Sequence, residues 1–339
     1  MNEAAGMIAG ILYNATSVTE MGHFVEHSLF SSVTVIHQEL EKMGYSVRLY
    51  EGNVGVEHLV KERDQISFVI DFIPWTRSDQ KICHPSLLNF YRIPFVGNES
   101  DALVLCADKI LTKLLAIAHK IPVPQFLLFS AEEADDSLYD RIVHICKLPF
   151  VLKANRTSGS LGVRLVHDLD EFFGMVKELS SLWGRCLFAE EYITGIDVTV
   201  PVLTIAREAI ALGTTKYLDK NQEEIEFFSH DCKYHESLTC AKFEDTVLTP
   251  QLMRYAAEMH SLCGCTALSR TDFRVSKEGK VFFLEINATP DLNLNGAFVK
   301  AGEGRPLYKI LQLSIDEALK NGLTTGRGCR SADYSLPEH

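Results

Sequence analysis

The chain has 339 residues, of which 46% are hydrophobic and 23% are charged, values typical of a globular protein of roughly two or three domains. Aspartate and glutamate outnumber lysine and arginine by 45 to 33, so the net charge is −12 and duplex nucleic acid is a poor partner. Nine cysteines without the spacing of a secreted disulfide framework indicate a reducing compartment, and we expect a cytoplasmic protein. No run of about 18 apolar residues predicts a membrane-spanning helix.

Strand-like and helix-like segments alternate along the chain, which predicts an α/β (α+β) fold. The apolar residues 4–12 have no basic residue before them, so this segment predicts a first strand rather than a signal peptide. Within residues 1–97 we expect strands at 7–13, 46–50 and 66–73 and a helix at 28–43. These elements would form an N-terminal α/β domain.

Residues 98–185 predict a second, smaller domain. A single amphipathic helix is expected at 101–120, because apolar side chains recur there at helical spacing, at Leu103, Ala107, Ile110, Leu111, Leu114 and Ala118. Strands are expected at 126–129, 150–153 and 163–166, with the glycine- and serine-rich loop RTSGSLG between the last two. Asp168, followed three residues later by a glutamate, predicts the start of another helix.

Residues 186–322 predict a third domain. We expect strands at 187–193, 198–204, 267–275 and 280–287, and a helix that starts with Thr249 as its N-cap and stops at Gly264. Residues 323–339 are polar and predict a flexible tail.

The stretch SRTDFRVSKEGKVFFLEINATP predicts a β-hairpin that carries chemistry. If its turn is the two-residue Glu278-Gly279, Asp272 lies opposite Glu285. Arg270 then lies opposite Asn287, and the period of two places these four side chains on one face of the hairpin. The other face would enter a core with Phe282, Leu284 and Ile286. A three-residue turn would instead place Asp272 opposite Leu284.

Two carboxylates that face each other across a strand pair repel, so we expect a cation between them. Oxygen ligands from aspartate, glutamate and asparagine suit Mg²⁺, which takes its remaining ligands from water and phosphate. Arg270 would then offset negative charge that develops on a substrate. The alternative is a solvated sheet face with a local Arg–Asp ion pair.

Cationic residues supply the other half of the predicted site. Lys153 ends a strand directly before the RTSGSLG loop, whose backbone N–H groups can bind phosphate oxygens, and Lys109 lies on the preceding helix. Together with the carboxylate pair, these lysines predict a site for a nucleoside triphosphate with magnesium. The strand end Glu190-Glu191-Tyr192-Ile193 could bind a purine through its backbone, and the alternative is an ordinary strand end with solvated acids.

These motifs, in this order, resemble the ATP-grasp superfamily and, more narrowly, the D-alanine–D-alanine ligase family, over roughly residues 98–300. The resemblance implies a three-domain architecture in which ATP and Mg²⁺ lie between the central and C-terminal domains. It also implies that ATP is contacted by the two lysines, by the RTSGSLG loop (the phosphate loop) and by the strand end at residues 190–193 (the purine edge). Further contacts would come from an aspartate that binds the ribose and from the segment HDCKYHES, which resembles a loop that closes the site (the closing loop). These residues are Lys109, Lys153, Ser158, Gly159, Ser160, Glu190, Glu191, Ile193, Asp197 and Lys233.

The same resemblance assigns the metal and the substrates. Asp272, Glu285 and Asn287 would bind Mg²⁺, while Arg270 and Lys233 would act on the transferred phosphate. Contacts to the amino-acid substrates would come from both ends of the chain, from Glu26, Tyr234, Arg270, Asp291 and Gly296. The partners would be a small carboxylate and a small amine, with neither nucleic acid nor membrane. Relatives of this kind are often homodimers, but the sequence indicates no interface.

The sequence departs from the family at the amino-acid side of the site. Asp291 follows Pro290 where the family has glycine, Gly296 replaces a serine, and the segment DFIPWTRSDQ lacks the family's His-Gly. We therefore expect an ATP-dependent carboxylate–amine ligase that forms an amide bond through an acyl phosphate and has altered substrates. A true D-alanine–D-alanine ligase is one alternative, and a nucleotide-binding protein without ligase activity is another.

Overall fold

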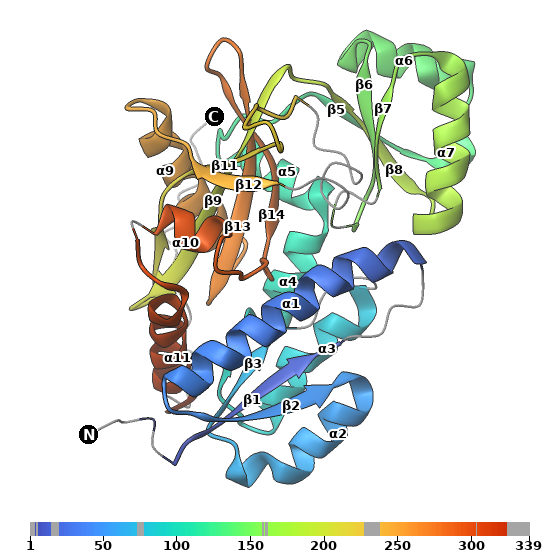
Figure 1. The fold of residues 1–339 in the computed structure, drawn as a ribbon. Helices are drawn as coiled ribbons and strands as arrows, with labels where there is room; N and C mark the ends of the chain where they lie inside the picture. The colour runs from blue at the N-terminus through green and yellow to red at the C-terminus, as the bar shows by residue number, and fades with distance from the viewer. Residues whose placement is uncertain are drawn as a thin grey trace.

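The computed structural model places most of the chain in three α/β units (Figure 1). Each unit, called a layer, consists of one β-sheet and the helices that pack on it. In three segments, 20–30, 78–82 and 321–323, only the backbone is described. The described residues are 4, 6–14, 20–72, 78–157, 159, 162–226, 238–302 and 304–323.

The N-terminal layer is a parallel sheet of order β2-β1-β3-β4, flanked by helices on both faces (Figure 1). The two central strands, β1 and β3, are short, hydrophobic and almost fully buried, as is usual for parallel strands that are covered on both sides. The predicted strands are confirmed, and the helix expected at 28–43 begins earlier, at Glu20. The elements are β1 (Ile8–Tyr13), α1 (Glu20–Lys42), β2 (Ser46–Glu51), α2 (Gly52–Glu62), β3 (Phe68–Asp71), α3 (Ser78–Phe90) and β4 (Phe95–Val96).

The helix predicted at 101–120 is wrong, because the chain forms two helices, α4 (Ser100–Ala107) and α5 (Lys109–Ala118). Asp108 between them is extended, and its carboxylate accepts the N–H of Leu111 at 3.0 Å, which caps α5. The break turns α5 so that Lys113 is buried while Leu111 and Leu114 are about half exposed. The predicted apolar stripe therefore does not face the core in this second half.

The central layer is an antiparallel sheet of order β5-β8-β6-β7, with α6 and α7 packed on one face (Figure 1). Asp168 caps α7 as predicted, by accepting the N–H of Glu171 at 2.9 Å. The strand that the sequence assigned to the third domain, β8, pairs with β5 and β6 here, so the central sheet extends past residue 185. The elements are β5 (Phe126–Ser130), α6 (Asp136–Cys146), β6 (Phe150–Ala154), β7 (Val163–Val166), α7 (Leu169–Trp183) and β8 (Cys186–Glu191).

The C-terminal layer is a larger antiparallel sheet of order β12-β11-β9-β13-β14, with β10 paired to β9. Thr249 is not the N-cap of α9: the helix starts at Leu248, and Asp245 accepts the first backbone N–H groups instead. The elements are β9 (Gly195–Ile205), β10 (Glu208–Ala211), β11 (Thr215–Leu218), β12 (Thr239–Lys242), α9 (Leu248–Leu262), β13 (Leu268–Ser276), β14 (Val281–Asn287), α10 (Ala297–Ala301) and α11 (Leu307–Leu323).

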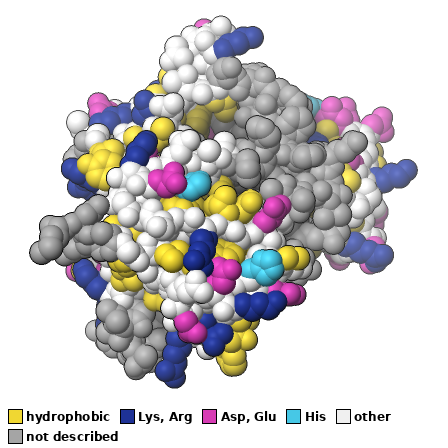
Figure 2. Space-filling model, turned by 60° about the horizontal axis from the view of Figure 1, so that its bottom comes forward, with side chains coloured by type: hydrophobic (Ala, Val, Ile, Leu, Met, Phe, Trp, Pro, Cys, Tyr) yellow, Lys and Arg dark blue, Asp and Glu magenta, His cyan; other side chains and the backbone are white. Residues whose placement is uncertain are grey.

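The N-terminal and C-terminal layers share one hydrophobic core. Helix α11 returns to the N-terminal sheet, where Ile310 and Ile315 are fully buried in the same cluster as Ile11 and Phe68 (Figure 1). None of the helices formed by the described residues has the length and apolarity of a membrane span. On the face that Figure 2 presents, acidic and basic side chains are interspersed among hydrophobic ones, so the net charge is not gathered into one patch there.

Candidate active site

The β13–β14 hairpin has the predicted register where the functional side chains lie. Arg270 pairs with Asn287, and Asp272 pairs with Glu285. The predicted two-residue turn is wrong, because the N–H of Ser276 bonds to the carbonyl of Lys280 at 2.8 Å and leaves a three-residue loop. Gly279 takes φ +77° in this loop, a value that glycine adopts without steric cost.

A β-bulge reconciles this longer turn with the register of the site. Phe273 pairs with Phe283, and Asp272 pairs with Glu285, so Leu284 is the extra residue. Next to the bulge the side-chain alternation shifts: Phe283 is fully buried, while Phe282 and Leu284 are only partly buried. The core face predicted from Phe282 and Leu284 is therefore wrong, whereas the pairing of the two carboxylates is confirmed.

Each of the two opposed carboxylates has a cationic partner. Arg270 forms a bidentate ion pair with Asp272, in which Nε lies 3.1 Å from Oδ1 and Nη2 lies 2.9 Å from Oδ2. Lys109 of α5 places its ammonium 3.1 Å from Oε2 of Glu285. Burial alone would raise the pKa of Glu285, but the lysine ammonium groups lower it to about 2. The alternative prediction was a solvated sheet face with a local Arg–Asp ion pair. This ion pair is present between Arg270 and Asp272, but the two side chains are largely buried rather than solvated.

The donors on this face fit a hard divalent cation. Asp272 and Glu285 supply carboxylate oxygens directly opposite each other, and Asn287 follows two residues along β14 with an amide oxygen. Such an all-oxygen set suits Mg²⁺, which completes its coordination with water or phosphate. Among the described residues no group of three or more His, Cys, Asp or Glu side chains could hold a metal ion.

A buried chain of charges joins α5 to the central sheet. Glu190 of β8 forms ion pairs with Lys113 through one carboxylate oxygen and with Lys153 of β6 through the other. Burial would raise the pKa of Glu190, but the two ammonium groups hold it below its usual value. Burial also lowers the pKa of Lys113 to about 8, although Glu190 opposes this shift. Lys153 and Glu190 were predicted as site residues from the sequence, whereas Lys113 was not.

The phosphate loop is held at its base by backbone and side-chain hydrogen bonds. The N–H of Ala154 bonds to the carbonyl of Gly162 at 2.9 Å, and Lys109 donates through Nζ to the carbonyl of Thr157. Asn155 accepts the backbone N–H of Lys109 at 3.0 Å, which ties the loop to the start of α5. Gly159 has φ +66°. The predicted phosphate contacts Ser158 and Ser160 lie outside the described residues.

Arg274 organises the predicted purine and ribose edge. It donates to Oδ1 of Asp197 at 2.9 Å and to the carbonyl of Ile193 at 2.8 Å. Burial raises the pKa of Asp197, and Arg274 opposes this shift. Glu191 lies close by at the strand end, where its backbone N–H bonds to the carbonyl of Gln125 at 2.8 Å.

On the predicted amino-acid side, two of the three departures from the family, Asp291 and Gly296, lie beside the same side chain, that of Asn293. Ser32 of α1 donates to one oxygen of Asp291, and Asn293 donates to the other at 2.7 Å. A Cβ on Gly296 would lie 2.9 Å from the Asn293 amide, so a side chain at 296 would require the amide that holds Asp291 to move. The side chains of Glu26, Lys233 and Tyr234 lie outside the described residues.

Lys113 and Arg274 were missed although the sequence carried a signal for both. Lys113 lies four residues after Lys109, one helical turn along the same face. Arg274 continues the alternation of Arg270 and Asp272 along the strand. Neither residue stood out, because a lone lysine or arginine is usually solvated.

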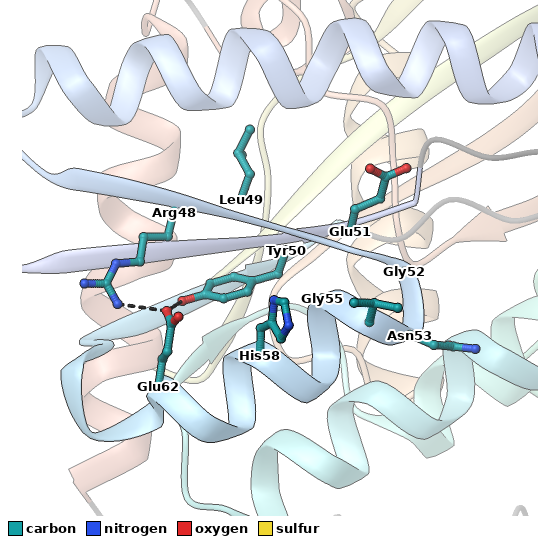
Figure 3. Close-up of a pocket in the computed structure, with 10 residues that line it drawn as sticks. Arg48, Leu49, Tyr50, Glu51, Gly52, Asn53, Gly55, His58 and Glu62 are labelled. Atoms are coloured by element: carbon teal, nitrogen blue, oxygen red, sulfur yellow. Dashed lines mark hydrogen bonds and ion pairs between the residues drawn. The ribbon is translucent and has the colours of Figure 1, made fainter.

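A separate pocket lies between β2 and α2 of the N-terminal domain, with a volume of about 730 Å³ (Figure 3). Arg48 and Tyr50 both point at Glu62, each with a hydrogen bond of 2.8 Å to the same carboxylate oxygen. Two causes raise the pKa of Tyr50 to about 12: burial, which is the larger, and the hydrogen bond to Glu62. This pocket shares no residue with the hairpin, the phosphate loop or the buried chain of charges.

Comparisons with known proteins agree with this geometry. The D-alanine–D-alanine ligase of Carboxydothermus hydrogenoformans is 25% identical over 293 residues, which cover 83% of this chain and 91% of that protein. The structure of the D-alanine–D-alanine ligase from Bacillus anthracis complexed with ATP has a TM-score of 0.75 at 20% identity and covers 95% of this chain and 99% of that one. The VanG D-Ala:D-Ser ligase of Enterococcus faecalis has a TM-score of 0.70 at 17% identity and covers 93% and 99%.

These structural similarities confirm the predicted ATP-grasp architecture of the fold. The family model for the C-terminal part of D-Ala-D-Ala ligases matches residues 115–303, more than half of the chain, and this range contains the phosphate loop, the Lys153–Glu190 ion pair and the hairpin. The chain therefore belongs to the D-alanine–D-alanine ligase family.

Proposed function

We propose that this protein is an ATP-dependent carboxylate–amine ligase that joins two amino-acid-like substrates through an acyl phosphate and releases ADP and phosphate. The observation that carries the proposal is the pairing of Asp272 with Glu285 across the hairpin, with Arg270 and Lys109 as their cationic partners. Family membership supports the same chemistry. ATP phosphorylates a carboxylate, an amine attacks the acyl phosphate, and phosphate leaves.

The hairpin would bind the metal that this chemistry requires. Asp272, Glu285 and Asn287 would hold Mg²⁺, which when bound offsets the negative charge of the phosphates. With a divalent cation at Glu285, Lys109 would no longer be needed to neutralise this carboxylate and could bind a phosphate oxygen instead. Arg270 lies on the same face and would stabilise the transferred phosphate.

The remaining residues would position the nucleotide. Lys153 and the backbone N–H groups of residues 158–160 would bind phosphate oxygens, and Lys233 of the closing loop would reach the terminal phosphate. The adenine edge would be formed by Glu190, Glu191 and Ile193. Asp197, which Arg274 holds in place, would accept hydrogen bonds from the ribose. Exclusion of water by the closing loop would protect the acyl phosphate from hydrolysis.

The amino-acid substrates are proposed from the relatives and from the altered loop. The names of those relatives support D-alanine as the first acid to test and D-alanine or D-serine as the first amines. Asp291 adds a fixed carboxylate on the predicted substrate side, which supports an amine substrate different from D-alanine. Glu26 and Tyr234 would bind the substrates from α1 and from the closing loop.

A second candidate is D-alanine–D-alanine ligation itself, which the match to the ligase of Carboxydothermus hydrogenoformans favours. A nucleotide-binding protein without ligase activity is the third candidate, because Asp291 could block the amine. For the location we propose the cytoplasm, since every cysteine side chain that the structure describes is a free thiol.

The test is ADP formation from MgATP with paired D- and L-amino acids, followed by mass spectrometry of the products. We expect one pair to give ADP, phosphate and the condensed dipeptide in equal amounts. Glu285→Gln should lower this turnover by about 100-fold or more, because it weakens the metal site, while Glu278→Gln at the exposed turn should not. ATP binding without ADP formation for any pair would favour the third candidate.

A further inference from the structure

Lys113 is a buried cation that the proposed mechanism does not use. Its side chain is 0% exposed, and lysine is almost never fully buried unless it is paired. Its ammonium forms an ion pair with Glu190 and donates to the backbone carbonyl of Phe283 at 3.4 Å. It also lies 5.9 Å from the centre of the Phe283 ring. The residue therefore spans from α5 to β8 and β14, three elements that surround the predicted nucleotide site.

Glu190 connects Lys113 to Lys153. The two lysines bind opposite oxygens of this carboxylate, and the Glu190 side chain is only 2% exposed. Lys153 is more accessible, with 12% of its side chain exposed, and it lies on β6 directly before the phosphate loop. Two ammonium groups and one carboxylate leave one positive charge in excess, and Lys153 is the member of the set that can offer it to an anion.

We infer that Lys113 is a positioning residue for the nucleotide, which acts by neutralising Glu190 so that Lys153 is available to the phosphates. This inference rests on the proposed function, because it assumes that Lys153 binds ATP. Without Lys113, the buried carboxylate has Lys153 as its remaining ion-pair partner. Separating that pair would leave an uncompensated buried charge, which is strongly unfavourable, so Lys153 stays on Glu190.

A purely structural role for Lys113 predicts a different outcome. Loss of packing between α5 and the two sheets would weaken the binding of any nucleoside to the same extent, whether or not it carries phosphates. Loss of charge balance at Glu190 would weaken the binding of phosphates alone. Comparison of a ligand that has phosphates with one that lacks them separates the two roles.

The experiment measures the dissociation constants of the non-hydrolysable ATP analogue AMPPNP, with Mg²⁺, and of adenosine, by competition with a fluorescent nucleotide. The unmodified protein is compared with Lys113→Met and Lys153→Met. We expect Lys113→Met to weaken AMPPNP binding at least tenfold and adenosine binding less than twofold. Lys153→Met should weaken AMPPNP binding to a similar degree, because both changes remove the same contact with the phosphates.

A second route tests the role of Glu190 directly. Adding Glu190→Gln to Lys113→Met removes the charge that retains Lys153, so the ratio of the AMPPNP constant to the adenosine constant should return to within about threefold of the unmodified protein. If Lys113→Met does not fold, as judged by circular dichroism, Lys113→Gln replaces it throughout. Equal loss for both ligands, or a ratio that does not recover when Glu190→Gln is added to Lys113→Met, would overturn the inference and leave the proposed function intact. Failure of the unmodified protein to bind AMPPNP would overturn both.

Discussion

At the scale of single residues, the site is built from charges that compensate one another in a largely buried space. Lys109 neutralises Glu285, Arg270 neutralises Asp272, and Arg274 neutralises Asp197. Opposite charges within about 4 Å interact strongly once water is excluded, so each pair fixes the position of a side chain that a ligand would use. Under the proposed function, binding of the metal and the nucleotide would exchange these ion-pair partners for ligand contacts.

Lys113 gives a prediction about the pH dependence of stability. Its pKa is about 8 in the folded chain against 10.5 for an unperturbed lysine, so between these values the unfolded chain binds more protons and stability rises with pH. Lys113→Met removes this contribution, roughly 2–3 kcal/mol. Urea unfolding at pH 7.5 and pH 10 should therefore show the unmodified protein gaining stability relative to the variant. The exposed Lys120→Met serves as the control, and identical behaviour of the two variants would contradict the burial of a charged Lys113.

Asp291 gives a prediction about the choice of amine. Asp291→Gly removes a fixed carboxylate that Ser32 and Asn293 hold in place. Less repulsion should raise the rate with an amine that carries an α-carboxylate by about tenfold relative to its amide derivative. The measurement is kcat/KM for D-alanine and for D-alaninamide with the same acid. An unchanged ratio would show that Asp291 does not face the amine substrate.

At the scale of elements, the predicted strands are confirmed, but the short strands β4, β10, β11 and β12 were not predicted. The periodicity also failed where polar side chains interrupt a pattern. The hydrophobic spacing of residues 101–120 continues across Asp108, so a single helix was predicted. The bonds that Asp108 makes to Asn155 and Arg156, 47 and 48 residues away in the chain, cannot be read from local spacing. The hairpin was similar: its β-bulge depends on packing of Phe283 in the core, which no local pattern reveals.

The break between α4 and α5 gives a prediction at this scale. Asp108→Ala removes the cap of α5 together with the partners of Asn155 and Arg156, so the free energy of unfolding should fall by about 1–2 kcal/mol. Urea unfolding followed by circular dichroism measures the change. Asp101→Ala, an exposed change in the first turn of α4, is the control. A loss of unfolding free energy no greater than that of the control would mean that Asp108 does not stabilise the break between α4 and α5.

At the scale of the whole molecule, Asn98 joins the N-terminal layer to the hairpin sheet. Its amide donates to the carbonyls of Leu268 and Ala288, at 2.6 Å each, and accepts the N–H groups of Thr266 and Ala267. The contact therefore fixes both ends of the hairpin to the segment that leaves β4. It spans about 170–190 residues of sequence, which is why no local pattern predicted how the N-terminal sheet and the hairpin sheet pack together.

Asn98→Ala should destabilise the protein by about 3 kcal/mol or more, because it leaves several buried backbone groups without a partner. Thermal unfolding should show the loss, and binding of Mg²⁺ to the hairpin should weaken in parallel because both strand ends lose their anchor. The exposed Asn221→Ala is the control. If the free energy of unfolding of Asn98→Ala lies within roughly 0.5 kcal/mol of that of the unmodified protein, as for a neutral surface change, the role given to Asn98 is contradicted.

The central claim, ligation through an acyl phosphate, is tested most directly by isotope transfer. The acid substrate that supports ADP formation is labelled with ¹⁸O in its carboxylate, and the inorganic phosphate released in one turnover is analysed by mass spectrometry. The proposed chemistry moves one carboxylate oxygen into the phosphate, because the bond that breaks during amide formation is the one between the acyl carbon and that oxygen. Unlabelled phosphate, or label found in AMP instead, would contradict it.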